Sequence, residues 1–67
     1  MMTYSARRRM NTIGWAHGWE GVIREDRRII WTGGFWGEIF RTPKEAKELA
    51  LAHARAEMER RIKEEKG

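Results

Sequence analysis

Hydrophobic positions follow two different periods along this chain, and the period changes near residue 42. From Trp19 to Arg41, apolar and polar side chains alternate in short runs rich in β-branched and aromatic residues. A period of two is typical of strands with one buried face. After Pro43 the apolar residues recur at helical spacing, and no helix breaker follows before Gly67. The pattern predicts an α+β fold, a three-stranded antiparallel sheet followed by one long C-terminal helix.

The strand boundaries follow from the turn residues between the apolar runs. We expect strands at Trp19 to Arg24, Arg28 to Thr32 and Phe35 to Arg41. The first turn is Glu25-Asp26-Arg27. Gly33-Gly34 suits a tight hairpin, because a primed turn needs a positive φ at both central residues.

Alternation along the first of these strands gives the sheet two candidate faces. The two sets of side chains are Trp19, Gly21 and Ile23 on one face, and Glu20, Val22 and Arg24 on the other. The first set is the better candidate for the buried face. Because one helix covers only one face of a small sheet, we expect some tryptophan side chains to stay partly exposed.

The helix has the clearest boundary in the sequence. Thr42 is the expected N-cap, Pro43 occupies the first helical position, and Glu45 completes a capping box. The stripe expected to face the sheet is Ala46, Leu49, Ala50 and His53. At about 1.5 Å per residue this helix is longer than strands of six or seven residues, so we expect residues 57–67 to overhang the sheet.

The overhanging end carries charges nearly all round, which leaves two interpretations open. It can be a solvated tail held by pairs at i,i+4, such as Glu57 with Arg61. Alternatively, a second stripe on the helix can seat a partner helix or form a homodimer. That stripe consists of Leu51, Ala54, Met58 and Ile62.

Residues 1–13 show no sustained period and contain the triplet Arg7-Arg8-Arg9. Three adjacent like charges repel one another when packed on one face. We interpret the segment as a mobile basic arm or a ragged first strand, ahead of a single domain at residues 14–67. A mobile arm predicts that deletion of residues 1–9 leaves the fold intact.

Size and composition exclude several classes of protein. A chain of 67 residues is too short for two cores, and without cysteine it has no disulfide. The candidate nucleophile Ser5 has no positioned base, and His17 and His53 do not make a metal site, so we expect neither an enzyme nor a bound metal or cofactor. No run reaches the roughly 18 apolar residues of a membrane span, and we expect a cytoplasmic protein.

The net charge is +4. All the positively charged side chains in residues 1–41 are arginines, and this part of the chain contains no lysine. Guanidinium groups form bidentate contacts with phosphates and guanine edges, and aromatic rings stack on bases. The alternative is that the aromatic rings form the core and the arginines only flank it. On the first interpretation the candidate nucleic-acid-binding residues are Arg7, Arg8, Arg9, Arg24, Arg27, Arg28, Trp36 and Arg41.

Parts of residues 20–54 resemble the DNA-binding domains of plant ethylene-response factors and the arm-binding domains of phage integrases. The similar segments are Glu20-Gly21-Val22-Ile23-Arg24, Trp36-Gly37-Glu38-Ile39 and Phe40-Arg41-Thr42-Pro43-Lys44-Glu45-Ala46. The resemblance implies a sheet that lies in the DNA major groove. The residues that the resemblance implies for DNA contacts are Arg24, which follows Gly-Val, and Trp36, which precedes Glu-Ile.

Two classes of function therefore remain after the sequence has been read. The leading one is a small domain that binds DNA or RNA, with Arg24 and Arg28 side by side next to the first turn. The alternative is a non-enzymatic protein-interaction module that docks or dimerises through exposed tryptophan and through Leu51, Met58 and Ile62. Tryptophan and arginine are enriched at both kinds of surface, so composition does not separate them.

Overall fold

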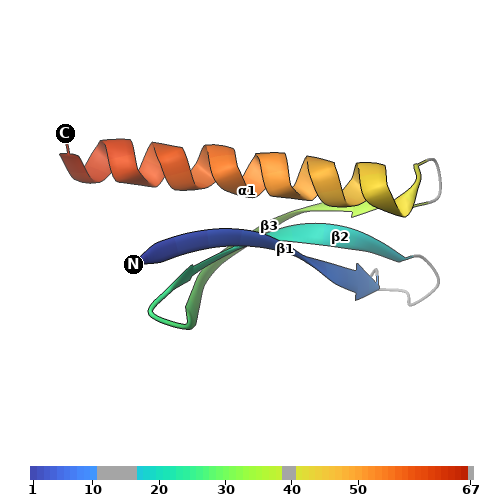
Figure 1. Ribbon diagram of the computed structural model, residues 1–67, viewed down its shortest axis with the longest axis horizontal. Helices are drawn as coiled ribbons and strands as arrows, with labels where there is room; N and C mark the ends of the chain where they lie inside the picture. Colours follow the sequence, from blue (N-terminus) through green and yellow to red (C-terminus); the bar gives the residue numbers. More distant parts are fainter. Residues whose placement is uncertain (11–16, 39–40, 67) are drawn as a thin grey trace.

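The computed structural model describes residues 1–10, 17–38 and 41–66. Its strands are β1 (Met2–Met10), β2 (His17–Glu25) and β3 (Arg28–Gly37), which form one antiparallel sheet in the order β1-β2-β3. The helix α1 (Pro43–Lys66) runs across one face of this sheet (Figure 1). The predicted α+β fold, three antiparallel strands followed by one helix, is confirmed.

The strand β1 lies in the segment that the sequence allows to be either a mobile arm or a ragged first strand. All nine residues of β1 pair with β2 without a shift, from Met2 opposite Glu25 to Met10 opposite His17. The repulsion expected within the arginine triplet is avoided, because alternation sends Arg8 to one face and its two neighbours to the other. Deletion of residues 1–9 is therefore expected to remove a strand of the sheet. Residues 11–13 lie outside the described part of the chain.

The predicted hairpin at Gly33-Gly34 is wrong, since β3 runs through both glycines. Gly34 has a φ of 72°, but it is the only glycine with a positive φ among the described residues, so the pair does not make a primed turn. The register between β2 and β3 shifts instead between Trp19 and Gly21, which is the signature of a β-bulge. The predicted strand end at 39–40 lies outside the described residues.

The turn between β2 and β3 is the one predicted hairpin that forms. Asp26 and Arg27 have φ angles of 50° and 72°, as a primed two-residue turn requires. The N-terminal ammonium group lies 3.0 Å from the Asp26 carboxylate. This ion pair holds the start of β1 beside the turn.

The core lies between the central strand and small residues of the helix. Ile23 of β2 and Ala46, Ala50 and Ala54 of α1 are completely buried there. Val22, which points to the opposite face of β2, is completely buried as well. The alanines recur every fourth residue, so the buried stripe is rotated away from the predicted one. Leu49, which was expected in the stripe, has an exposed fraction of 38%.

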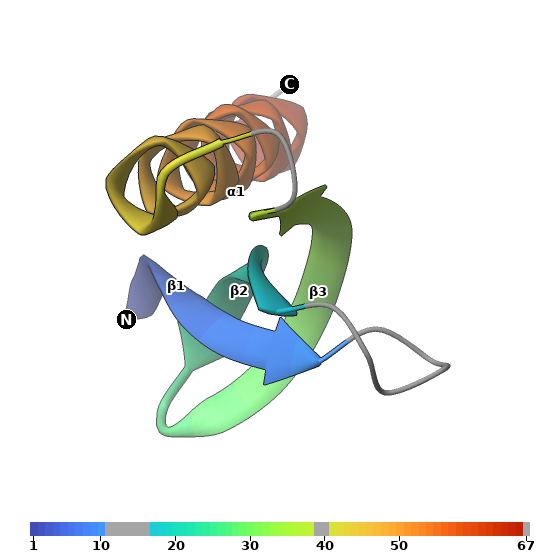
Figure 2. The ribbon, with the colours of Figure 1, turned by 90° about the vertical axis from the view of Figure 1, so that its right-hand side faces the viewer.

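Close packing of α1 on β2 depends on Gly21. A Cβ atom at this position would lie 2.9 Å from both the Ala50 carbonyl oxygen and the Ala54 Cβ. Gly21 therefore faces the helix, and by alternation so do Trp19 and Ile23, as the sequence predicted. Figure 2 shows the helix above this side of a strongly twisted sheet.

The helix begins where the capping pattern placed it. The Thr42 hydroxyl accepts a hydrogen bond from the Glu45 amide at 3.2 Å, and the Thr42 carbonyl accepts one from Ala46 at 3.0 Å. The Glu45 carboxylate receives a bond from the Thr42 hydroxyl at 3.1 Å. These contacts satisfy donors at the first turn and explain why the helix starts at Pro43.

The C-terminal end of α1 overhangs the sheet less than expected. Because β1 has nine residues, it spans about 30 Å, close to the length of the helix. Arg61 and Glu64 line a hollow together with Met2, Glu25 and Ile30. On the helix itself, the Glu57 carboxylate binds both Arg60 and Arg61, at 2.6 Å and 2.8 Å.

Among the described residues, α1 carries too much charge to be a membrane span.

Candidate nucleic-acid interface

The sheet surface opposite α1, the open face, is not covered by the helix (Figure 1). Alternation from Gly21, which faces the helix, assigns Glu20, Val22 and Arg24 of β2 to this face. The register transfers the assignment to β1 and β3. The side chains of the open face are Thr3, Ser5, Arg7, Arg9, Glu20, Val22, Arg24, Ile29, Thr32 and Phe35.

A buried carboxylate connects two arginines at the centre of the open face. Glu20 has an exposed fraction of 1%, although no helix covers it. Its Oε2 accepts a hydrogen bond from Arg7 Nε at 2.5 Å, and its Oε1 accepts one from Arg9 Nη1 at 2.8 Å. The arginine side chains are each about half exposed. The bridge fixes both guanidinium groups at the centre of the open face.

The bridge sets the protonation of Glu20. Burial acts to raise the pKa of the carboxyl group, but the hydrogen bonds from Arg7 and Arg9 and their positive charges outweigh burial and hold the pKa below its ordinary value of 4.5. The group is therefore ionised at neutral pH. A buried carboxylate in contact with two guanidinium groups is stable because its charge is compensated.

Arg24 and Phe35 extend the open face on either side of this bridge. Arg24 is half-buried and donates from Nη1 to the Ser5 hydroxyl at 3.0 Å. The Phe35 ring lies over Gly18, whose register partner on β1 is Arg9. With an exposed fraction of 37%, Phe35 presents part of its ring next to the arginines. Three guanidinium groups, one carboxylate and one ring thus share this surface.

The structure divides the predicted site residues between the two faces. Arg7, Arg9 and Arg24 lie on the open face. Arg8 lies on the helix side, where its Nη2 donates to Glu38 at 3.2 Å. Arg28 pairs with Glu25, whose side chain alternates to the face opposite that of Arg24. The prediction that the Arg24 and Arg28 side chains lie side by side is therefore wrong.

Trp36 is also on the helix side, among residues that hold the sheet and helix together. Its ring meets His53 of α1 edge-on at a centroid distance of 6.3 Å, and His53 stacks on Trp31 at 5.5 Å. The Arg41 guanidinium lies over the Trp36 ring, 5.6 Å from the ring centroid. These contacts assign Trp36 and Arg41 to packing in this structure. Arg27 is exposed in the turn.

Several residues of the open face were not singled out from the sequence. The sequence pattern does not mark Ser5, Thr32 or Phe35 as interface residues, and for Glu20 it indicates only the face of the strand. The bulge in β3 puts Trp36 on the helix side and Phe35 on the open face, because it changes which of two adjacent residues faces the helix. A sequence signal was present in Gly33-Gly34 and Gly37, which suit an irregular strand as well as a turn.

Comparisons with protein-family models, with curated proteins and with solved structures find no match for this chain. Function is therefore argued from the geometry of the site. Among residues 1–10, 17–38 and 41–66, no group of histidine and carboxylate side chains is suited to hold a metal ion.

Proposed function

We propose that this protein binds nucleic acid through the open face of its sheet. The observation that carries the proposal is the convergence of Arg7, Arg9 and Arg24 on the one sheet face that α1 leaves free, against the single carboxylate of Glu20. The four groups give this surface a formal charge of +2. Phosphate groups are the partner that suits such a surface, because guanidinium groups bind them through paired hydrogen bonds.

Two further features support this partner. Arg7 and Arg9 lie two residues apart on one strand, so their attachment points are about 6.8 Å apart and both side chains point the same way. The exposed part of Phe35 offers a surface on which a base or a sugar can pack. The resemblance to sheet-reading DNA-binding domains reaches Arg24, which lies on this face, whereas its other residue, Trp36, lies on the helix side.

The test compares two arginine variants that change net charge equally. Arg24→Gln removes a charge from the open face, and Arg55→Gln removes one from α1 as the matched control. Each protein is titrated against duplex DNA, single-stranded DNA and an RNA hairpin across a salt series. We expect Arg24→Gln to reduce the salt slope by about 0.9 on duplex DNA, and Arg55→Gln to leave it unchanged. Equal effects of the two variants, or no binding by the wild type at low salt, would overturn the proposal.

Glu20→Gln gives a second and opposite signal. The substitution removes the carboxylate that competes with phosphate for Arg7 and Arg9, so we expect tighter binding and a steeper salt slope. Phe35→Ala should weaken binding to single strands by roughly 1–3 kcal/mol if bases stack on the ring. Weaker binding of the Glu20→Gln protein, with its fold intact by circular dichroism, would contradict the role given to Arg7 and Arg9.

A further inference from the structure

The two edges of the sheet differ in how well they can accept another strand. The β3 edge is irregular, because its register with β2 shifts at two places. Such bulges twist an edge away and hinder pairing with another chain. The β1 edge pairs with β2 over nine residues without any shift and is the outer strand of the sheet. Within the described part of the chain, its outer side therefore presents a long, regular row of backbone groups that no other strand pairs.

We propose that β1 pairs with β1 of a second copy of this chain, in an antiparallel arrangement about a two-fold axis at Ala6. This would join two sheets into one of six strands. Ala6 is the middle residue of β1, so this register pairs the whole strand from Met2 to Met10. The inference does not depend on nucleic-acid binding, since it uses the edge of the sheet rather than its open face.

The charge pattern along β1 selects the antiparallel orientation. Residues 2–6 are uncharged, and the arginines follow at residues 7–9. Parallel strands in register would place each arginine beside its own copy. With Ala6 on the axis, Arg7, Arg8 and Arg9 instead lie opposite Ser5, Tyr4 and Thr3 of the second copy. Hydroxyl groups and an aromatic ring are favourable neighbours for guanidinium groups.

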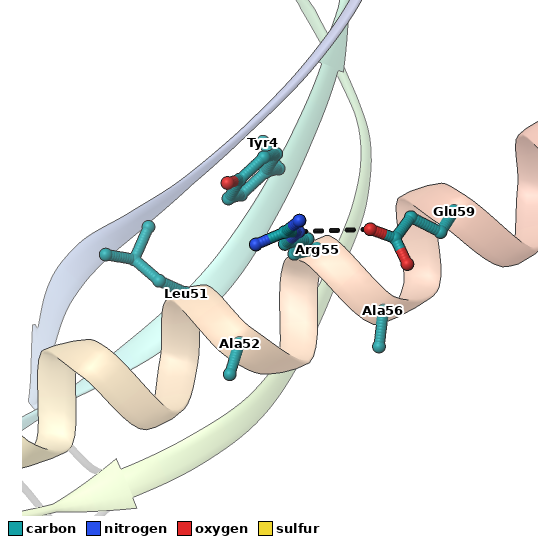
Figure 3. Close-up of a pocket in the computed structure, with 6 residues that line it drawn as sticks. All are labelled: Tyr4, Leu51, Ala52, Arg55, Ala56 and Glu59. Atoms are coloured by element: carbon teal, nitrogen blue, oxygen red, sulfur yellow. Dashed lines mark hydrogen bonds and ion pairs between the residues drawn. The ribbon is translucent and has the colours of Figure 1, made fainter.

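A groove beside the β1 edge supplies a surface for the second copy. It has a volume of about 470 Å³ and is lined by Tyr4 of β1 and by Leu51, Ala52, Arg55, Ala56 and Glu59 of α1. Figure 3 shows Tyr4, Leu51 and Arg55 around the space between strand and helix. Arg55 and Glu59 form an ion pair at 3.0 Å, so the groove carries no net charge. Two copies can therefore approach each other here without repulsion between like charges.

The spacing of the elements fits two helices on one face of the joined sheet. Ala50 and Ala54 lie over β2, and Leu51 and Arg55 border β1. With strands about 4.8 Å apart, the two-fold axis would place the helices roughly 10 to 14 Å from each other. That distance is slightly wider than direct helix packing, and side chains as long as Arg55 can fill the difference.

The isolated chain also leaves much of its apolar surface exposed. Of the five fully buried apolar residues among those described, three are alanines. Tyr4 at the β1 edge is 37% exposed. Domains of this size hide only about 60% of the surface of the unfolded chain, and many small scaffolds gain stability by association. A second copy on the β1 edge would cover Tyr4 and the groove together.

A cysteine scan tests the position of the axis, because the chain contains no cysteine of its own. Ala6→Cys would place two thiols directly opposite each other, with Cα atoms about 4.5–5.5 Å apart, which suits a disulfide. Thr32→Cys on the β3 edge is the matched control. Under mild oxidation we expect rapid formation of a covalent dimer from the Ala6→Cys protein and not from the control. Equal rates for the two variants would overturn the β1 interface.

Substitution of Thr3 tests the antiparallel register through its charge. Thr3→Arg would face Arg9 of the second copy twice per dimer, whereas Thr3→Glu would face it with the opposite charge. By sedimentation equilibrium we expect the dissociation constant to rise about tenfold or more for Thr3→Arg and to fall or stay level for Thr3→Glu. Circular dichroism checks that both variants fold. A wild-type chain that stays monomeric up to about 1 mM would overturn the proposal.

Discussion

Gly21 of β2 lies directly beneath Ala54 of α1, so closely that an added Cβ would come within 2.9 Å of the Ala54 Cβ. This contact sets the distance between the helix and the sheet. The other neighbour at 2.9 Å is the Ala50 carbonyl oxygen, a backbone atom that cannot rotate away. The position therefore requires glycine for reasons of space rather than of backbone conformation.

Gly21→Ala is expected to lower the free energy of unfolding by about 1–3 kcal/mol, because the added methyl group forces the helix away from the sheet. Urea denaturation measures the change. Gly37→Ala is the control, since among the described residues its Cβ would meet Phe35 Cε1 alone, at 3.7 Å, an ordinary contact. Equal losses in the two variants would show that close packing at Gly21 is not what limits this position.

Thr42→Ala should lower the free energy of unfolding by about 1 kcal/mol, because the Glu45 amide loses its acceptor at the start of α1. Thr42→Ser retains the hydroxyl and should leave stability nearly unchanged. Thermal melting followed at a helical wavelength compares the three proteins. A melting temperature that is the same for Thr42→Ala and the wild type would contradict the capping role.

Arg27→Gly should stabilise the protein by about 0.5–1 kcal/mol. Arg27 has a φ of 72° in the turn between β2 and β3, a conformation that strains a residue with a Cβ and that glycine adopts freely. Arg28→Gly has the same change in charge at the first residue of β3 and should be destabilising. Denaturation curves of the two variants that shift in the same direction would contradict the prediction.

The acid stability of the fold should depend on Glu20. Its pKa is lower in the folded chain than its ordinary value of 4.5, so the stability that it contributes is present above that value and is lost as the pH falls through the folded pKa. Glu20→Gln should cost about 1–2 kcal/mol at pH 7, because charged hydrogen bonds to Arg7 and Arg9 are weakened. Between about pH 5 and pH 3 the variant should lose less stability than the wild type. Parallel pH profiles of the two proteins would contradict this account.

Interactions between neighbouring residues made some elements predictable from the sequence. The capping pattern at Thr42-Pro43-Lys44-Glu45 fixed the start of the helix, because its contacts all lie within one turn. Alternation along β2 identified Trp19, Gly21 and Ile23 as the set that faces α1. The turn at Asp26 and Arg27 was also visible, since strands flank it on both sides in the sequence.

Elements that depend on contacts with residues far away in the sequence were predicted less well. The arginines at residues 7–9 left residues 1–13 open to interpretation as a mobile arm or a ragged first strand. In the structure the carboxylates of Glu20 and Glu38, far away in the sequence, pair with these arginines and favour a strand there. In the same way, Gly33-Gly34 suits a turn locally, but pairing with β2 extends β3 through it as an irregular strand.

What the sequence by itself determined is the order of elements, the helix start and the preference of β2 for one face, because these follow from neighbouring residues. Only the tertiary structure decided which arginines share a face. The register shift between Trp19 and Gly21 decides which of Phe35 and Trp36 faces the helix, and alternation separates Arg24 from Arg28. The period of a strand is two, so a shift of one residue moves a side chain to the opposite surface. That shift depends on pairing between strands, which residue order does not specify.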